Sequence, residues 1–285
     1  MNGQKPTQLK KILQEILLLI LEIAAIFLSL NQSAFETNLD EVESAYMEYE
    51  VEEAEPELIF QGEKLDSFHQ IENPVMGQDV KIVYLTFDDG PGEYTEQLLD
   101  ILDLYGIKAT FFVTNQLPEY QDLIGEAYRR GHSIGLHSYN HDYSIYRSEE
   151  DYYEDLQLIH DVCEEQTGDS PRIVRFPGGS SNLTSRKYGY GIMSVLTQSL
   201  GDNGYLYCDW NVSSGDMENA VTSYAVTRNV IEGIQGKEIS VVLQHDTLDY
   251  SVEAVSKIIC WGLANGYTFL PLTEYSPMVH HTVKN

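Results

Sequence analysis

Between residues 81 and 270, short runs rich in Val, Ile, Phe and Tyr alternate with longer segments whose apolar residues recur at helical spacing. This alternation limits the possible folds most, because repeated strand–helix units predict a parallel sheet whose strands are joined by helices. We expect an α/β domain, either a closed or incomplete β/α barrel or an open doubly wound sheet. The expected strands are 81–87, 109–114, 132–136, 172–176, 205–208, 239–243 and 267–270, and the expected helices are 94–105, 119–130, 149–166, 185–200, 220–234 and 252–264.

The chain before this region predicts a separate N-terminal part. Residues 12–30 are almost continuously apolar and follow three lysines, which indicates an export signal close to the roughly 20 residues that cross a bilayer. No small residue stands three positions before a suitable cut, so we favour a signal anchor over a cleaved signal peptide for residues 1–34. Glu15 and Glu22 leave an amphipathic helix on a membrane surface open, because an acid at the membrane centre costs about 2.5–3.5 kcal/mol.

The charge distribution separates a linker from the domain. Residues 35–72 contain 13 acidic residues and one basic residue, so 35–75 is expected to be a self-repelling, extended linker. Residues 76–285 then form one domain, which we expect outside the cell membrane or, alternatively, secreted. The formal charge of −28 excludes a nucleic-acid binder that acts through a basic surface, and no motif implies a protein partner.

The first expected strand runs directly into the sequence TFDDGP, residues 86–91, with no glycine-rich phosphate-binding loop. Asp88 and Asp89 would repel each other at the end of a buried strand unless a positive group lay beside them. An Asp-Gly-Pro turn also has an ordinary structural reading as a turn or helix cap. This motif alone therefore leaves a catalytic and a structural role open.

The third expected strand ends in a His-x-x-x-His pair, His137 and His141, whose rings would share one face if the turn were helical. The three cysteines form no CxxC pair, so histidine and carboxylate would have to hold any metal. Two histidines and one carboxylate leave coordination positions open for water and substrate. A metal centre with an accessible face is the interpretation that we favour.

Three later strand ends add polar groups at the same expected edge: Arg175, the pair Asp209 and Trp210, and the run LQHD at 243–246. Barrel enzymes draw catalytic groups from the carboxyl ends of several strands. Taken singly, Arg175 could be a plain ion pair, Trp210 a core residue and the histidine of LQHD a buried structural residue.

The ordered set TFDDGP, HSYNH, RFP, DW and LQH resembles the polysaccharide deacetylase family, also called the NodB homology domain or carbohydrate esterase family 4, over roughly residues 80–275. The resemblance implies a distorted β/α barrel and metal-dependent removal of acetyl groups from sugars. It implies that Asp88 is the general base and that Arg175 holds it by an ion pair. It also implies one divalent metal ion, with Zn favoured and Co, Mn, Ni or Fe as alternatives; the ligands would be Asp89, His137 and His141.

The same resemblance implies that His245 is the general acid that protonates the leaving group. Asp209 would orient or charge His245. Trp210 and Leu243 would line the pocket for the acetyl methyl, and Tyr139 would be available for stacking against a sugar.

This chain departs from the family pattern after Pro177, where Gly178 replaces the usual aromatic residue. We expect one wall of the substrate groove to be missing and the loop to be more mobile. The backbone N–H of Gly178 can still face an oxyanion, because that role needs no side chain.

Together these features predict a hydrolase that removes acetyl groups from N-acetylglucosamine units of a polysaccharide, with cell-wall peptidoglycan preferred. One alternative is an O-acetyl esterase acting on xylan or another acetylated polymer. Another is a wall-binding module without turnover. Because the domain is strongly acidic, we expect recognition through short sugar contacts rather than through electrostatic docking on anionic wall polymers.

Overall fold

The computed structural model describes residues 81–285. The predicted N-terminal anchor, 1–34, and the acidic linker, 35–75, lie outside the described residues. Among the helices of 81–285, none combines the length and the hydropathy that a membrane-spanning helix requires.

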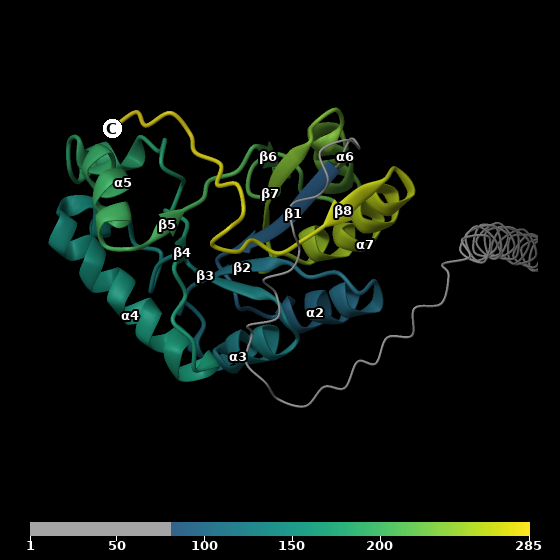
Figure 1. The fold of residues 1–285 in the computed structure, drawn as a ribbon, viewed down its shortest axis with the longest axis horizontal. Helices are drawn as coiled ribbons and strands as arrows, with labels where there is room; N and C mark the ends of the chain where they lie inside the picture. The colour runs from purple at the N-terminus through teal and green to yellow at the C-terminus, as the bar shows by residue number, and fades with distance from the viewer. Residues whose placement is uncertain (1–80) are drawn as a thin grey trace, which may run out of the picture. The chain divides into compact units, whose positions relative to one another are not determined.

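In residues 81–285, strands and helices alternate along the chain, and the helices surround the strands (Figure 1). The strands are β1 Lys81–Asp88, β2 Thr110–Val113, β3 Ser133–Leu136, β4 Ile173–Val174, β5 Leu206–Tyr207, β6 Val212–Ser213, β7 Ile239–His245 and β8 Tyr267–Phe269. The α-helices are α2 Thr95–Leu104, α3 Asp122–Arg129, α4 Glu149–Thr167, α5 Ile192–Asp202, α6 Ser223–Ile234 and α7 Asp249–Ala264, and the short 3-10 helices are η2 Pro118–Tyr120, η3 Tyr143–Arg147 and η4 Thr184–Lys187.

The strands form one parallel sheet in the order β5-β4-β3-β2-β1-β7-β6, and β8 pairs with β1 beside this path. β5 and β6 are consecutive in the chain but lie at opposite ends of this order. The barrel is therefore incomplete between them. The predicted α/β fold of the distorted-barrel type is confirmed.

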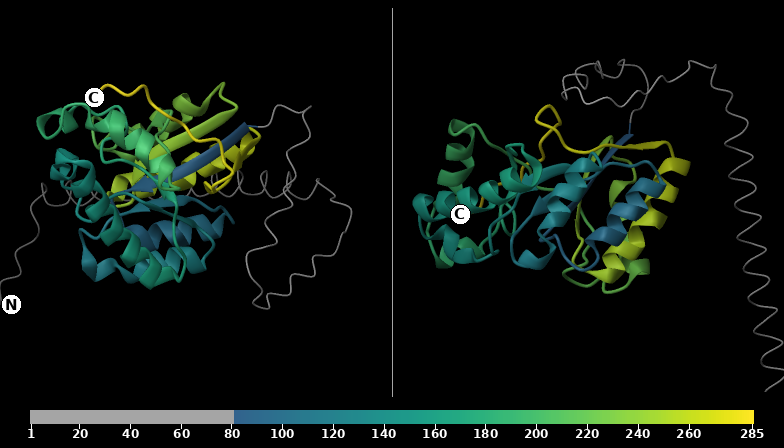
Figure 2. Two further views of the ribbon diagram at one scale, coloured as in Figure 1. Left: turned by 60° about the vertical axis from the view of Figure 1, so that its left-hand side comes forward. Right: turned by 90° about the horizontal axis from the view of Figure 1, so that it is seen from below.

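The two faces of the sheet have different neighbours. On β1, Val83, Leu85 and Phe87 belong to the larger core cluster, which the surrounding helices complete (Figure 2). Tyr84 belongs to a second, smaller cluster. Because alternate residues of a strand point to opposite faces, Asp88 shares the face of Tyr84.

Two local features differ from the expectation. The helix expected over 185–200 begins only at Ile192, since Gly191 has φ +79° and the residues before it form η4 instead. β6 was not predicted, because Val212 is the only apolar residue between Trp210 and Gly215 and no apolar run marks a strand there.

Candidate active site

The carboxyl ends of β1 and β3 bring the three predicted metal ligands together. Asp89 Oδ1 lies 3.3 Å from His137 Nε2 and 3.5 Å from His141 Nε2, and one ligand atom of each residue lies within 4.8 Å of the others. Asp89 Oδ1 is buried and has no hydrogen-bond partner among the described residues. An orphaned carboxylate oxygen facing two imidazole nitrogens fits a divalent transition-metal ion.

The electrostatics of the cluster favour an ionised carboxylate. Burial alone would raise the pKa of Asp89, but its interaction with His137 and the charges of His141 and His245 outweigh burial and hold it well below its usual range. Asp89 is therefore a carboxylate at any physiological pH, which is the form that binds a metal.

The backbone at two of these ligands adopts a conformation that side chains other than glycine rarely take. Among the described residues, Asp89 at φ +73° and His141 at φ +56° are the only two non-glycine residues with positive φ. Such conformations cost of order 1 kcal/mol or more and concentrate at functional sites. The two histidines do not share a helical face; instead a bend at His141, whose N–H donates to Ser138 Oγ at 3.0 Å, brings the rings to 5.2 Å.

His137 is fixed by the strand next to its own. Its Nδ1 lies 2.7 Å from the carbonyl oxygen of Arg175, which follows β4. A hydrogen bond there places the proton on Nδ1 and leaves Nε2 free to face Asp89, the arrangement expected of a metal-binding histidine.

Asp88 lies beside a fully buried guanidinium. Arg175 Nη1 donates to Asp88 Oδ1 at 2.8 Å and to Thr86 Oγ1 at 2.6 Å. Arg175 Nε and Nη2 donate to the carbonyl oxygens of Cys208 and Asp209, at 2.9 and 3.0 Å. The predicted Asp88–Arg175 ion pair is present, and it supplies the positive charge that two adjacent aspartates require.

His245 is held by a carboxylate that sequence reasoning missed. Asp216 Oδ1 lies 2.9 Å from His245 Nδ1, and Asp216 Oδ2 accepts the His245 backbone N–H at 2.8 Å. Burial alone would lower the pKa of His245, because it disfavours the charged ring. The hydrogen bond and charge of Asp216, with the charges of Asp88 and Asp89, outweigh burial and raise this pKa to about 9. The prediction that Asp209 orients His245 is wrong.

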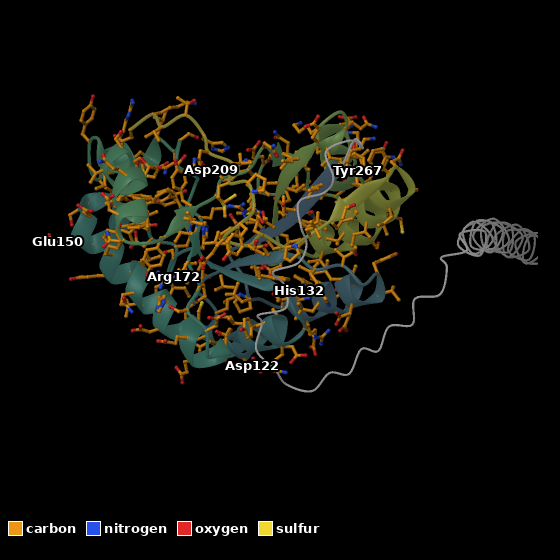
Figure 3. All side chains as sticks on the ribbon, viewed as in Figure 1. Asp122, His132, Glu150, Arg172, Asp209 and Tyr267 are labelled. Carbon is orange, nitrogen blue, oxygen red and sulfur yellow. The ribbon has the colours of Figure 1, made fainter. Side chains whose placement is uncertain are left out.

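Asp209, which is labelled in Figure 3, instead holds two loops through hydrogen bonds. Its carboxylate accepts hydrogen bonds from Ser180 N at 2.8 Å, Ser180 Oγ at 2.5 Å and the backbone N–H of His281 at 2.8 Å. The topology explains the error: β6 pairs with β7, which carries His245, whereas Asp209 follows β5 at the opposite end of the sheet.

Hydrogen bonds hold the loop that follows β4. Gly178 and Gly179 both have φ +76°, and a Cβ atom on Gly179 would lie only 2.9 Å from Trp210 Cη2. Asn182 Nδ2 donates to the carbonyl oxygen of Gly179 at 2.7 Å, and Asp209 holds the next residue. These contacts hold Gly179 and Ser180 in place, and the greater mobility expected of the loop stays a prediction.

The four residues predicted to contact substrate lie at the carboxyl ends of the strands, and their roles remain predictions. Gly178 is exposed, and its N–H donates no hydrogen bond to another described residue. Trp210 is partly buried, with its ring 4.7 Å from that of His281. Tyr139 packs partly against the larger core, and Leu243 is a partly buried residue of β7.

Residues 76–190 match the family model described as polysaccharide deacetylase. A peptidoglycan-N-acetylglucosamine deacetylase from Bacillus cereus is 31% identical over 206 residues, which cover 70% of this chain and 72% of that protein. The chain belongs to the polysaccharide deacetylase family. The deacetylase fold also matches the catalytic domain of a peptidoglycan N-acetylglucosamine deacetylase from Eubacterium rectale, with 55% identity, a TM-score of 0.71, and coverage of 72% of this chain and 94% of that one. A polysaccharide deacetylase from Bacillus cereus matches with 29% identity, a TM-score of 0.62, and coverage of 70% and 96%.

Asp246, which the sequence placed among the polar groups at a strand end without a role, supports the turn after Asp89 in this deacetylase. Asp246 is buried, and its Oδ2 accepts a hydrogen bond from Thr95 Oγ1 at 2.5 Å. Thr95 Oγ1 in turn accepts the N–H of Gly92 at 2.8 Å, and a Cβ on Gly90 would lie 2.2 Å from the Asp246 carboxylate oxygens. Burial raises the pKa of Asp246 to about 7. Only the folded chain reveals this contact, because the two segments are distant in sequence.

Proposed function

We propose that this chain removes the acetyl group from N-acetylglucosamine units of cell-wall peptidoglycan by metal-dependent hydrolysis. The observation that carries the proposal is the placement of two opposite kinds of acid–base group around one metal-binding carboxylate. Asp88 precedes Asp89 in the chain and is paired with Arg175, while His245 Nε2 lies 3.8 Å from Asp89 Oδ2. The relatives named above act on the same bond, according to their names.

Asp88 is suited to accept a proton from the attacking water. Its carboxylate is held by the ion pair with Arg175, which also donates to Thr86 and to two carbonyl groups. A divalent ion held by the Asp–His–His set would polarise the acetyl carbonyl and acidify the attacking water. Asp88 then supplies the base without itself being a metal ligand.

His245 is suited to donate a proton to the departing nitrogen. An amine is a poor leaving group until it is protonated, so amide hydrolysis needs an acid as well as a base. Asp216 occupies Nδ1 of His245, which leaves Nε2 directed at the site. The raised pKa keeps the imidazolium populated at neutral pH.

The remaining residues would position the substrate. The free N–H of exposed Gly178 would donate to the acetyl oxygen as negative charge develops there. Trp210 and Leu243 would line the pocket for the acetyl methyl, and Tyr139 would offer an aromatic face to the sugar.

The experiment is acetate release from purified peptidoglycan, chitin oligomers and acetylated xylan, each with and without a chelator. We expect chelator-sensitive release from the N-acetylated substrates and the greatest kcat/KM on peptidoglycan. Release from xylan alone would instead establish the O-acetyl esterase. Binding of peptidoglycan without release from any polymer would establish the wall-binding module.

We also propose that residues 12–30 hold the deacetylase domain on the outer side of the cell membrane. The apolar run, the preceding lysines and the acidic linker support this location. External protease should then release residues of the domain from intact spheroplasts, with the chain otherwise found in the membrane fraction. A mature chain that is free in the medium and begins near Phe35 would contradict the anchor.

A further inference from the structure

Tyr143 lies at the metal-binding cluster and has no role in the mechanism above. It is the first residue of η3 and comes two positions after His141. Its ring meets the ring of His141 edge-on, at 5.6 Å between centroids, and that of Tyr146 at 5.8 Å. The side chain is partly exposed, so a substrate can reach it.

The hydroxyl of Tyr143 makes no hydrogen bond with any other residue of 81–285, whereas its neighbour in η3 does. Tyr146 Oη donates to the carbonyl oxygen of Pro177 at 2.9 Å, which fixes that ring structurally. Tyr143 packs in the same row of rings but keeps its polar atom unused. An unused donor at the solvent-accessible edge of a site is available to a ligand.

The Tyr143 hydroxyl lies directly against Gly178. A Cβ atom on Gly178 would be 2.6 Å from Tyr143 Oη and 3.5 Å from Tyr143 Cε1. A side chain at position 178 would therefore collide with the phenol, so Tyr143 occupies the space that such a side chain would take. The N–H of Gly178 is unused too, so two free hydrogen-bond donors stand side by side near the metal ligand His141.

We propose that Tyr143 is a catalytic residue whose hydroxyl donates a second hydrogen bond to the acetyl oxygen, beside the N–H of Gly178. This inference rests on the deacetylase function proposed above. A tyrosine hydroxyl is a hydrogen-bond donor as well as an acceptor. Donors placed where negative charge develops stabilise the transition state more than the bound substrate.

The test replaces only the hydroxyl, in the full chain loaded with metal. Tyr143→Phe should lower kcat by roughly 10²- to 10³-fold, the usual effect of losing one oxyanion donor, on both an N-acetylglucosamine oligomer and an activated aryl acetate. The loss should extend to the ester because both substrates develop an oxyanion. Tyr128→Phe is the matched control, since its hydroxyl contacts Asp169 on the surface, and it should leave kcat unchanged.

Two further readouts separate this role from a structural one. Melting temperature and metal content of Tyr143→Phe should equal those of the wild type. In the Asp88→Asn background, binding of the intact oligomer by calorimetry should change less than threefold when Tyr143→Phe is added, because the hydrogen bond strengthens only in the transition state. A kcat within twofold of the wild type, a loss confined to KM, a loss of metal or a tenfold loss of oligomer binding would each overturn the inference.

The same experiment separates this inference from the proposed function. If the wild-type chain releases no acetate from any N-acetylated substrate, both fall. If the wild type is active and Tyr143→Phe is equally active, only the role of Tyr143 falls.

Discussion

Nδ1 of His245 lies 2.9 Å from Oδ1 of Asp216, a residue 29 positions earlier in the chain. The same carboxylate accepts the His245 backbone N–H and the hydroxyl of Ser251. Burial would raise the pKa of Asp216, but its contacts with His245 and Ser251 outweigh burial and lower this pKa. The imidazole is thereby fixed in orientation and biased towards its charged form.

Asp216→Asn should move the alkaline limb of the kcat/KM profile to lower pH. A general acid works while it is protonated, so activity is lost as pH rises through its pKa. Removing the negative partner lowers the pKa of His245 from about 9, and the limb follows it. Asp209→Asn is the control, because Asp209 holds the Ser180 loop and should not move this limb. A shift in the Asp209 variant alone would return the role to Asp209.

Replacing a metal ligand should abolish both metal binding and turnover. Asp89→Ala, His137→Ala and His141→Ala each leave two of three protein ligands, and purified variants should contain less than a tenth of the wild-type metal. Asp88→Asn is the matched control, since it should keep the metal and still lose roughly 10²- to 10⁴-fold in rate. Full activity after chelation, with no metal detected by elemental analysis, would contradict the site.

Arg175→Ala should lower the free energy of unfolding as well as the catalytic activity. Arg175 is fully buried and donates to Asp88, Thr86 and two carbonyl groups, so its loss leaves a buried carboxylate without a counter-charge. Removing one partner of a buried ion pair typically costs about 3–5 kcal/mol, which urea denaturation would measure. Arg172→Ala, at an exposed arginine, should change the free energy of unfolding by about 0.5 kcal/mol or less. Equal effects of the two variants would show that the Arg175 network contributes little.

Motifs that are contiguous in the sequence predicted much of the site, because the residues of one short segment at a strand end stay close together in the fold. Asp88 ends a buried strand and Asp89 follows it, and the strand order then places them near His137 and Arg175. Asp216 could not be predicted in the same way. It follows β6, which no apolar run marks in the sequence, and only the pairing of β6 with β7 brings it to His245.

Asp246→Asn should stabilise the metal-free protein at neutral and alkaline pH. Burial raises the folded-state pKa of Asp246 to about 7 from its ordinary value of 3.8, so the folded state binds the proton more tightly than the unfolded state. Its contribution to stability is full below about pH 4 and is lost as pH rises to about 7. The amide removes this loss, and the gain at pH 8 should be at most roughly 4 kcal/mol. Unfolding free energies that differ equally from the wild type at pH 4 and pH 8 would contradict the buried, protonated carboxyl.

The most direct measurement compares acetate released with glucosamine formed when the metal-loaded chain acts on purified peptidoglycan. N-deacetylation predicts one glucosamine residue for each acetate, with neither product formed by Asp88→Asn. The glucosamine is detected by mass spectrometry after enzymatic digestion of the glycan chains, which leaves the remaining N-acetyl groups intact. Acetate without glucosamine, or no acetate at all from peptidoglycan, would contradict the account.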